Sequence, residues 1–204
     1  MPLIENTAAV LMLWAVIGYA MGSVPFGMVL ARLMGLGNLR EVGSGNIGAT
    51  NVLRTGNKAA AALTLLLDAG KGAVALLLAR WATGSEDAAQ LAGLAAMLGH
   101  CYPVWLRFNG GKGVATFLGL LLALHWPVGV GACLAWLVGA GISRISSMGA
   151  LVAAAASTFL MAFLGAGDAI LLGAILTLLI FWRHRANISR IRARTEPKIG
   201  KTPK

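Results

Sequence analysis

A polar run between two apolar segments, Gly43 to Asn57, carries the residue types that hold a phosphate group. Glycine lacks a Cβ atom, so backbone N–H groups in such a run can approach an anion closely. Ser44 or Thr50 could also cap a following helix, whose first N–H groups would then face the same ligand. The alternative is an ordinary glycine-rich loop. The candidate substrate-binding residues of this run, which offer hydroxyl, amide, backbone and guanidinium groups, are Ser44, Gly45, Asn46, Thr50, Asn51 and Arg54.

A second glycine-rich run, Asn109 to Thr116, places a lysine just before an apolar segment. Lys112 is flanked by Gly110, Gly111 and Gly113, an arrangement suited to neutralising phosphate charge. The alternative is a lysine that only marks the cytoplasmic side, but such a marker would not require three flanking glycines. The spacing GxxxxGK[ST] is missing, so the run is not a nucleotide P-loop. Two such runs in one chain favour an anion-binding site over two linkers.

Asp68 and Lys71 lie one helical turn apart inside an apolar segment, where unpaired charges are costly. We therefore expect them to pair with each other. They could form a structural ion pair near the membrane edge, or Lys71 could contribute to the anion site while Asp68 orients it. His100, at the end of the next apolar segment, fits a satisfied helix-end histidine better than a base.

Near the C-terminus, His184 and Asn187 are three residues apart and would share a face if the last helix continues past the membrane. Neighbouring arginines disfavour protonation of this histidine, so His184 could act as a neutral base. The alternative is a tail histidine among solvated charges. A hydroxyl cluster precedes the sixth apolar segment, and Ser146 is its best-placed member; the cluster comprises Ser143, Ser146 and Ser147.

The composition identifies the elements that must position these residues. Hydrophobic residues make up 58% of the chain and charged residues 12%, whereas about 25% charged residues is typical of soluble domains. Because about 20 apolar residues span a bilayer, we predict an all-α polytopic membrane protein with about seven transmembrane helices, forming a single domain over residues 1–204. The predicted spans lie near residues 8–32, 59–80, 88–106, 114–130, 130–142, 148–164 and 168–182. The 114–142 stretch could instead be one tilted hairpin around Pro127 and Gly129, or one long helix.

The basic residues predict how the chain crosses the membrane, because cytoplasmic loops collect Lys and Arg. The tail, about residues 183–204, holds eight of the seventeen basic residues, so we expect the C-terminus in the cytoplasm. With seven spans the N-terminus then lies outside, and every polar motif faces the cytoplasm. The net charge of +10 therefore reflects topology and contact with anionic membrane lipids, and no nucleic-acid partner is expected.

Six motifs occur in a characteristic order along nearly the whole chain. They are GSVPFG (22–27), GSGNIGATN (43–51), DAGKG (68–72), GH (99–100), GGKGVAT (110–116) and HRANISRI (184–191). In order, spacing and chain length this set closely resembles the bacterial acyl-phosphate:glycerol-3-phosphate acyltransferase family. The resemblance implies a seven-span enzyme of the bacterial inner membrane, with its site facing the cytoplasm. Its implied reaction joins acyl phosphate and glycerol-3-phosphate into 1-acyl-glycerol-3-phosphate (lysophosphatidic acid) and releases phosphate.

The resemblance also implies roles for the candidate residues. Lys112 and its glycines would bind the acyl-phosphate group or the departing phosphate, and the proton acceptor would be His184 or the substrate's own phosphate. The chain departs from the family pattern at Arg144-Ile145-Ser146, where an aromatic residue is expected, so Ser147 remains an alternative to Ser146. Glycerol-3-phosphate would be bound by Ser44, Asn51, Arg54 and Ser146, with His184 and Asn187 closing the site.

Other function classes fit the sequence less well. The chain has no Ser-His-Asp set, no metal-ligand spacing and no aspartate five residues after any histidine, so a covalent acyl-enzyme, a metal and a cofactor are not expected. A transporter of an organic phosphate is the main alternative, but we find no inverted repeat and the polar motifs gather on one face. A non-catalytic lipid-binding scaffold would tolerate replacement of Lys112. A chain this small could act as a monomer.

Overall fold

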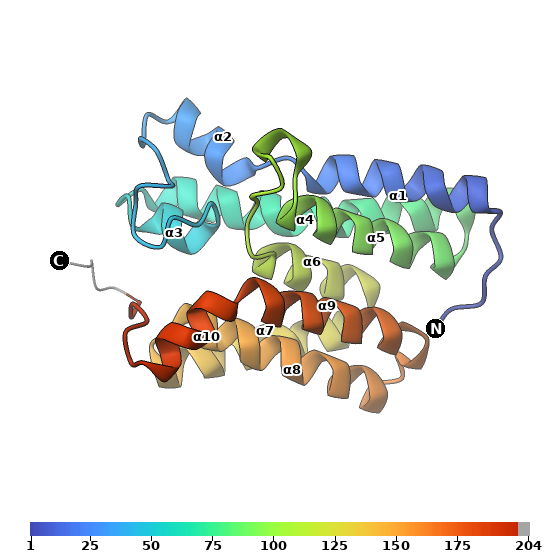
Figure 1. The fold of residues 1–204 in the computed structure, drawn as a ribbon. Coiled ribbons are helices and arrows are strands. Elements are labelled where there is room, and N and C mark those ends of the chain that lie inside the picture. The colour runs from blue at the N-terminus through green and yellow to red at the C-terminus, as the bar shows by residue number, and fades with distance from the viewer. Residues whose placement is uncertain (200–204) are drawn as a thin grey trace. The chain divides into compact units, whose positions relative to one another are not determined.

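The computed structural model describes residues 1–199 and contains two compact units, residues 2–124 and residues 125–199. Every regular element in this described range is a helix, as the composition predicts (Figure 1). Residues 200–204, the last part of the predicted cytoplasmic tail, lie outside the described residues.

The first unit is built from two long helix pairs and a set of short helices at one end. Helix α1 packs along α5, and α4 packs along both α5 and α6. Short helices α2 and α3 lie at the end of α4 where that helix begins (Figure 1). The elements are α1 (Ala8–Gly22), α2 (Phe26–Leu33), α3 (Ala49–Leu53), α4 (Lys58–Thr83), α5 (Glu86–Cys101), the 3-10 helix η1 (Val104–Leu106) and α6 (Val114–Leu124).

Glycines set the distance between these helices. A Cβ atom at Gly22 of α1 would lie 2.0 Å from the carbonyl oxygen of Ala96 on α5. A Cβ atom at Gly119 of α6 would lie 2.2 Å from the carbonyl oxygen of Ala69 on α4. Because no side chain fits at either position, the backbones touch directly, which is how small-residue helices associate in membranes.

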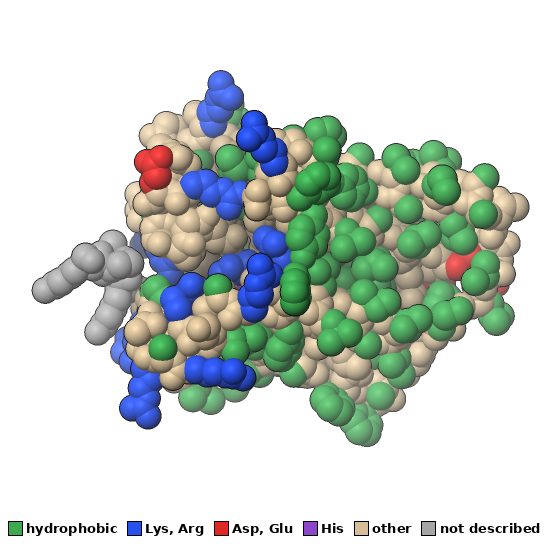
Figure 2. Space-filling model, viewed as in Figure 1, with side chains coloured by type: hydrophobic (Ala, Val, Ile, Leu, Met, Phe, Trp, Pro, Cys, Tyr) green, Lys and Arg blue, Asp and Glu red, His purple; other side chains and the backbone are tan. Residues whose placement is uncertain are grey.

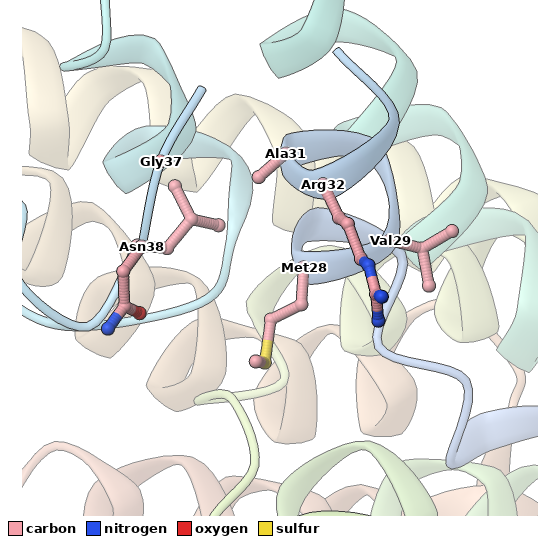
Figure 3. Close-up of a pocket in the computed structure, with 7 residues that line it drawn as sticks. Met28, Val29, Ala31, Arg32, Gly37 and Asn38 are labelled. Atoms are coloured by element: carbon pink, nitrogen blue, oxygen red, sulfur yellow. The ribbon is translucent and has the colours of Figure 1, made fainter. Parts of the chain in front are cut away.

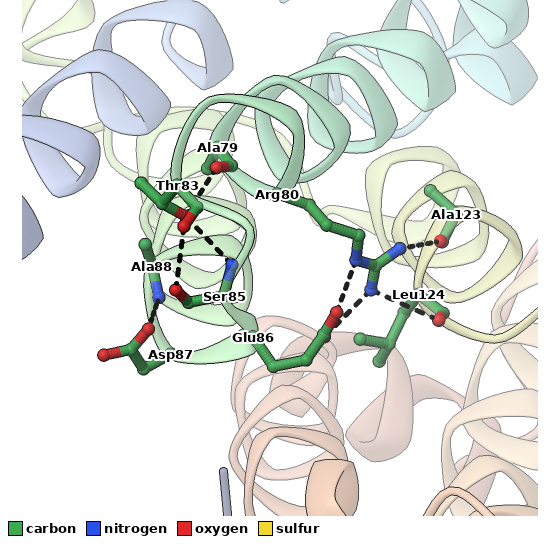
Figure 4. A network of polar contacts seen from close by, with 9 residues as sticks. All are labelled: Ala79, Arg80, Thr83, Ser85, Glu86, Asp87, Ala88, Ala123 and Leu124. Atoms are coloured by element: carbon green, nitrogen blue, oxygen red, sulfur yellow. Dashed lines mark hydrogen bonds and ion pairs between the residues drawn. The ribbon is translucent and has the colours of Figure 1, made fainter. Parts of the chain in front are cut away.

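At the opposite end of the first unit, Arg80 joins three helices (Figure 4). It lies near the end of α4 and pairs with Glu86, the first residue of α5, with 2.9 Å between Nη2 and Oε2. Its Nη1 also donates to the carbonyl oxygen of Ala123, at 3.0 Å, near the end of α6. The guanidinium thus satisfies a helix C-terminus that would otherwise lack a partner for its carbonyl groups.

The second unit contains three longer helices and one short terminal helix. A Cβ atom at Gly149 of α8 would lie 2.6 Å from the carbonyl oxygen of Trp136 on α7. The hydroxyl of Thr177 on α9 donates to the carbonyl oxygen of Ala154 on α8, at 2.7 Å. The elements are α7 (Trp126–Ser143), α8 (Ser146–Phe163), the 3-10 helix η2 (Gly167–Ala169), α9 (Ile170–Arg183) and α10 (Arg185–Arg192), with a 59° bend before α10.

Each of the predicted apolar segments is largely helical, but the helix bounds differ from the prediction. By length and composition four helical stretches could cross a membrane, Ala8–Leu33, Lys58–Thr83, Trp126–Ser143 and Ser146–Phe163, and the bent stretch from Gly167 to Arg192 could be a fifth. Helices α5 and α6 are shorter, with 16 and 11 residues. The number of seven spans and the placement of the two termini therefore stay predictions.

The boundary predicted at residue 130 is wrong, and so is the alternative of one long helix over residues 114–142. Helix α6 ends at Leu124 and α7 begins at Trp126. His125 between them has an extended backbone, with φ −153° and ψ 100°. Pro127 follows in the first turn of α7, where its missing N–H costs no hydrogen bond. Helix α7 therefore starts four residues before the predicted boundary at residue 130, with the proline in its first turn.

Each unit separates its charged surface from its apolar surface (Figure 2). In the first unit, Lys and Arg side chains gather at the end that carries α2 and α3, and hydrophobic side chains are numerous over the rest of the visible face. In the second unit the basic side chains gather at the end that carries α10. Large exposed hydrophobic residues such as Leu66, Trp81 and Phe163 suit contact with lipid tails.

Candidate active site

The first polar run is organised around the buried side chain of Asn51, which is 1% exposed. Its Oδ1 accepts hydrogen bonds from the backbone N–H of Ser44 at 3.1 Å and from Nη1 of Arg54 at 3.1 Å. Its Nδ2 donates to the carbonyl oxygens of Leu39 at 2.9 Å and Asn46 at 2.7 Å. Both donors of the amide are thus engaged by backbone carbonyl oxygens, and its oxygen holds Ser44 and Arg54 in place.

The residues of this run near the Asn51 side chain differ in exposure. Ser44 and Thr50 are exposed and Arg54 is half-buried. Gly43 and Gly45 have φ values of 52° and 66°, a left-handed conformation that favours glycine. A Cβ atom at Gly43 would also lie 2.6 Å from Cδ of Arg54. The glycines therefore allow the chain to fold back on the arginine.

The expected helix caps are different in the structure. Helix α3 begins after Gly48, which supplies no side-chain cap, and α4 begins after Asn57, whose Oδ1 accepts from the N–H of Ala60 at 2.9 Å. Neither Ser44 nor Thr50 caps a helix in these positions, so the expectation that one of them would is wrong. Both residues are exposed, and the hydroxyl of Ser44 donates to Oδ1 of Asn51 at 3.3 Å.

The second run, residues 109–113, folds against the C-terminal end of α5. The N–H groups of Gly110 and Gly111 donate to the carbonyl oxygens of Cys101 at 3.1 Å and His100 at 3.0 Å. A Cβ atom at Gly111 would lie 2.2 Å from Nε2 of His100. Both amides are therefore used to hold the loop, and Lys112 is left half-buried between closely packed glycines.

Gly113 completes the loop and leads into α6. Its φ is +82°, and a Cβ atom there would lie 2.2 Å from Cε of Met97. Its carbonyl oxygen accepts the N–H of Phe117 at 2.7 Å, which starts the helix. Lys112 thus lies two residues before the N-terminus of α6, where the helix dipole favours a bound anion.

Arg40 connects the two runs, although the sequence marks it only as a basic loop residue. Its Nη1 donates to the carbonyl oxygen of Gly45 at 3.3 Å, and its Nη2 donates to the carbonyl oxygen of Asn109. Arg40 and Asn109 are 69 residues apart in the chain. The structure therefore joins the two predicted phosphate loops through Arg40 at one end of the first unit.

Lys71 lies inside the helix pairs. Its Nζ is 2.9 Å from Oδ1 of Asp68 and donates to the carbonyl oxygen of Val24 at 2.9 Å. Each side chain of the pair is only 3% exposed. The ring of Phe26 lies 5.8 Å from the ammonium group. This geometry is that of a buried ion pair, so the pairing expected from the spacing is confirmed.

In the second unit, a carboxylate from the chain after α10 gathers the candidate side chains. Oε1 of Glu196 accepts from Oγ of Ser147 at 2.7 Å and from Nδ2 of Asn187. Oε2 accepts from Nε of Arg190 at 2.6 Å. The Glu196 side chain is 7% exposed. Glu196 is not among the candidate residues predicted from the sequence, although it is the only acidic residue among residues 183–204.

These hydrogen bonds decide the ionisation of Glu196. Burial raises the pKa of its carboxyl group, but the hydrogen bonds from Ser147, Asn187 and Arg190 lower it more. The pKa therefore lies below its ordinary value of about 4.5, and the group is charged at neutral pH. A charged acceptor strengthens each hydrogen bond.

His184 and the serine pair occupy the adjoining helix ends of the second unit. His184 is 2% exposed, and its Nδ1 lies 2.8 Å from the carbonyl oxygen of Ile180. If Nδ1 donates to that carbonyl, Nε2 keeps a lone pair and can accept a proton. Ser147 is buried beside Glu196, whereas Ser146, the preferred candidate from sequence, is half-buried at the start of α8.

A shallow hollow beside α2 contains none of the predicted site residues (Figure 3). Its volume is about 280 Å³, and its lining includes Met28 and Arg32 of α2 and Asn38 of the next loop. Asn38 is already engaged by Glu41, with Nδ2 to Oε1 at 2.6 Å. Among residues 1–199 there is also no group of three His, Cys, Asp or Glu side chains that could hold a metal ion.

Comparison with known proteins identifies a family over most of the chain. The family model described as glycerol-3-phosphate acyltransferase matches residues 12–194. A glycerol-3-phosphate acyltransferase of Ruegeria pomeroyi is 69% identical over 200 residues, covering 98% of this chain and 98% of the relative. One of Roseobacter denitrificans is 70% identical over 198 residues, covering 97% and 98%.

Two solved structures share the fold. A crystal structure of PlsY (YgiH), described as an integral membrane glycerol 3-phosphate acyltransferase in its glycerol 3-phosphate form, matches with a TM-score of 0.87. It is 36% identical and covers 93% of this chain and 96% of its own. The lysophosphatidic acid form matches with a TM-score of 0.84 at 34% identity, covering 93% and 95%.

Proposed function

Because this chain belongs to the glycerol-3-phosphate acyltransferase family, we propose that it transfers an acyl group from acyl phosphate to the 1-hydroxyl of glycerol-3-phosphate. It is an integral membrane enzyme of lipid biosynthesis. The proposed products are 1-acyl-glycerol-3-phosphate (lysophosphatidic acid) and inorganic phosphate. We place the reaction in the bacterial inner membrane, with the site facing the cytoplasm.

The reaction forms one C–O bond and breaks another. The oxygen of the glycerol hydroxyl attacks the acyl carbonyl carbon, and negative charge develops on the carbonyl oxygen. The bond from that carbon to the phosphate oxygen then breaks, and phosphate leaves. The hydroxyl proton passes to His184 or to a phosphate oxygen of the substrate. Both substrates are anions, and further negative charge develops on the carbonyl oxygen. Cations and hydrogen-bond donors that the protein already holds in place lower the barrier by stabilising this developing charge.

The observation that carries the proposal is the meeting of the two glycine-rich runs at Arg40. Lys112 emerges from one run and Arg54 from the other, within the same unit. We assign Lys112 to the acyl phosphate or the departing phosphate. We assign Ser44 and Arg54 to the phosphate of glycerol-3-phosphate. In the second unit, His184 and Asn187 are assigned catalytic roles, with Ser146 or Ser147 as a further substrate contact.

The test is a transfer assay with purified protein in detergent or lipid mesophase. Palmitoyl phosphate and labelled glycerol-3-phosphate are supplied in one arm, and palmitoyl-CoA replaces the acyl phosphate in a second arm. We expect labelled lysophosphatidate from the acyl phosphate arm alone. Product from palmitoyl-CoA alone would overturn the proposed donor. No product in either arm from protein with an intact thermal transition would overturn acyl transfer and direct attention to phosphate uptake in proteoliposomes.

A further inference from the structure

Three ionisable side chains lie buried in the first unit, below the glycine loop. Asp68 and Lys71 come from α4 and His100 comes from the end of α5. Oδ1 of Asp68 is 2.9 Å from Nζ of Lys71 and 3.7 Å from Nδ1 of His100, and each side chain is 3% exposed. The proposed reaction uses none of the three. Burying charged groups between helices costs free energy. We therefore ask which parts of the chain these three side chains hold in place.

His100 holds the middle of the loop. Its carbonyl oxygen accepts the N–H of Gly111 at 3.0 Å. Its ring also touches that glycine, because a Cβ atom at Gly111 would lie 2.2 Å from Nε2. The opposite ring nitrogen, Nδ1, faces Asp68. The imidazole therefore lies between the carboxylate of Asp68 and the backbone next to Lys112.

Asp68 holds the far end of the same loop through its main chain. Its carbonyl oxygen accepts the hydroxyl of Thr116 at 2.8 Å. Thr116 is the third residue of α6 and is fully buried. A Cβ atom at Gly72, one turn along α4, would lie 2.9 Å from Cγ2 of Thr116. The glycine loop is thus fixed on one side at Gly111 and on the other at Thr116, by residues of one cluster.

Lys71 ties this cluster to the break between α1 and α2. Its Nζ donates to the carbonyl oxygen of Val24 in that break. The chain after α5 is attached to the same break, because Nε1 of Trp105 donates to the carbonyl oxygen of Ser23 at 3.1 Å and to its Oγ at 2.9 Å. The break, the cluster and the segment that leads into the glycine loop therefore form one connected polar framework.

We propose that Asp68, Lys71 and His100 are positioning residues that set the place of Gly111, and through it the ammonium group of Lys112. The functional part of this inference rests on the proposed function. An ion pair fixes direction as well as distance, whereas apolar side chains of similar size would fill the space without orienting the imidazole. The cluster acts on the reaction only through the loop, so its loss should weaken substrate binding more than it weakens the helix packing.

The test uses Asp68→Asn together with the double variant Asp68→Asn/Lys71→Met. The single variant leaves the Lys71 ammonium without its carboxylate, which destabilises the protein, whereas the double variant leaves no unpaired charge. Thr64→Val is the matched control: Thr64 is fully buried one turn earlier on α4, and its hydroxyl donates only within the helix, to the carbonyl oxygen of Ala60 at 2.7 Å. Thermal unfolding, amide hydrogen exchange of residues 107–118 and transfer kinetics are measured for each protein.

We expect the double variant to recover most of the thermal stability lost in Asp68→Asn. Its Gly110 and Gly111 amides should still exchange at least about tenfold faster than in wild type, and its KM for acyl phosphate should rise roughly tenfold, because the loop that carries Lys112 is displaced. Thr64→Val should match the wild type in all three measurements. A double variant with wild-type exchange and wild-type KM would overturn the inference.

Thr116→Val provides a second test that removes only a hydroxyl group. It should also speed exchange in the loop, by a smaller factor, while α6 remains folded. Unchanged exchange in a folded Thr116→Val protein would overturn the fixation of the loop at that end. The exchange measurement needs no catalytic activity. If wild type transfers no acyl group, the proposed function fails, and the exchange data still decide whether the cluster positions the loop.

Discussion

The two units hold their candidate groups by different means. In residues 2–124, Lys112 and Arg54 stand on loops whose shape depends on glycines and on hydrogen bonds to backbone carbonyl oxygens. In residues 125–199, Asn187 and Ser147 stand on helices and converge on the single carboxylate of Glu196. The first arrangement tolerates no added bulk, because Cβ atoms would overlap neighbouring atoms. The second tolerates no loss of charge, because one acceptor serves several donors.

Buried charge shows the same contrast. Asp68 and Lys71 are paired deep between helices of the first unit, where the partners neutralise each other. Glu196 lies after the last helix and is paired with Arg190, whose side chain is 38% exposed. Solvent therefore reaches the second cluster more easily than the first. We expect pH and salt to act mainly on the second unit.

The largest expected effect is at the loop itself. Lys112→Ala should reduce acyl transfer by at least about 100-fold, because a fixed cation next to the reacting phosphate is lost. The thermal transition should change little, since the side chain is half-buried and its glycines hold the loop without it. The exposed Lys58→Ala, at the start of α4, is the control and should retain activity. Near-normal transfer by the Lys112 variant would remove the lysine from the mechanism and favour a scaffold function.

Next in size is the replacement of the shared acceptor. Glu196→Gln keeps the shape of the side chain but replaces one acceptor oxygen by an NH2 group. That group cannot accept the hydrogen bonds that Ser147, Asn187 or Arg190 donate to the carboxylate. We expect a loss of about 1–3 kcal/mol in stability and a roughly tenfold fall in kcat through displacement of Asn187. Asp168→Asn, an exposed carboxylate of the same unit, should change neither quantity. A stable, fully active Glu196→Gln enzyme would contradict the role of Glu196 as the centre of this cluster.

A smaller effect should appear when pH is varied. The pKa of Glu196 is lower in the folded protein than its ordinary value of about 4.5, so folding favours the charged form. Its contribution to stability is therefore fully present above about pH 4.5 and is lost as the pH falls through the folded pKa. The difference in Tm between wild type and Glu196→Gln should be constant at neutral pH and should narrow below about pH 4.5. A difference that does not narrow would show that charge is not what Glu196 contributes.

The smallest effect is expected far from either cluster. Arg80→Met removes the link between α4, Glu86 and the end of α6 (Figure 4). Because the Arg80 and Glu86 side chains are 29% and 36% exposed, the loss in stability should be only about 1 kcal/mol. The KM for glycerol-3-phosphate should not change. A large rise in that KM would mean that the two ends of the first unit are coupled. The control is Arg32→Met, which makes the same replacement at an exposed arginine.

Much of this architecture could be predicted from short windows of sequence. Apolar segments with few charges predict membrane helices wherever they occur, because the bilayer imposes the same requirement on each. Glycine-rich runs around Lys112 and Arg54 predict tight loops with a cation, because that chemistry is local. The pairing of Asp68 with Lys71 follows from their spacing on one helix. The boundary at residue 130 was misplaced because the apolar pattern continues through His125, where the turn geometry ends the helix two residues before Pro127.

Only the tertiary structure could show the contacts between distant parts of the chain. Arg40 and Asn109 are 69 residues apart, Glu196 and Ser147 are 49 residues apart, and the contact of His100 with Gly111 depends on how the loop folds back onto α5. Nothing near Arg40 in the sequence distinguishes it from other basic loop residues. The choice between Ser146 and Ser147 likewise depends on which hydroxyl the helix turns toward Glu196. Residue type and spacing determined the class of protein and the chemistry available to it, whereas packing decided which polar groups bind substrate and which hold other groups in place, because a hydrogen bond depends on position in space and not on distance along the chain.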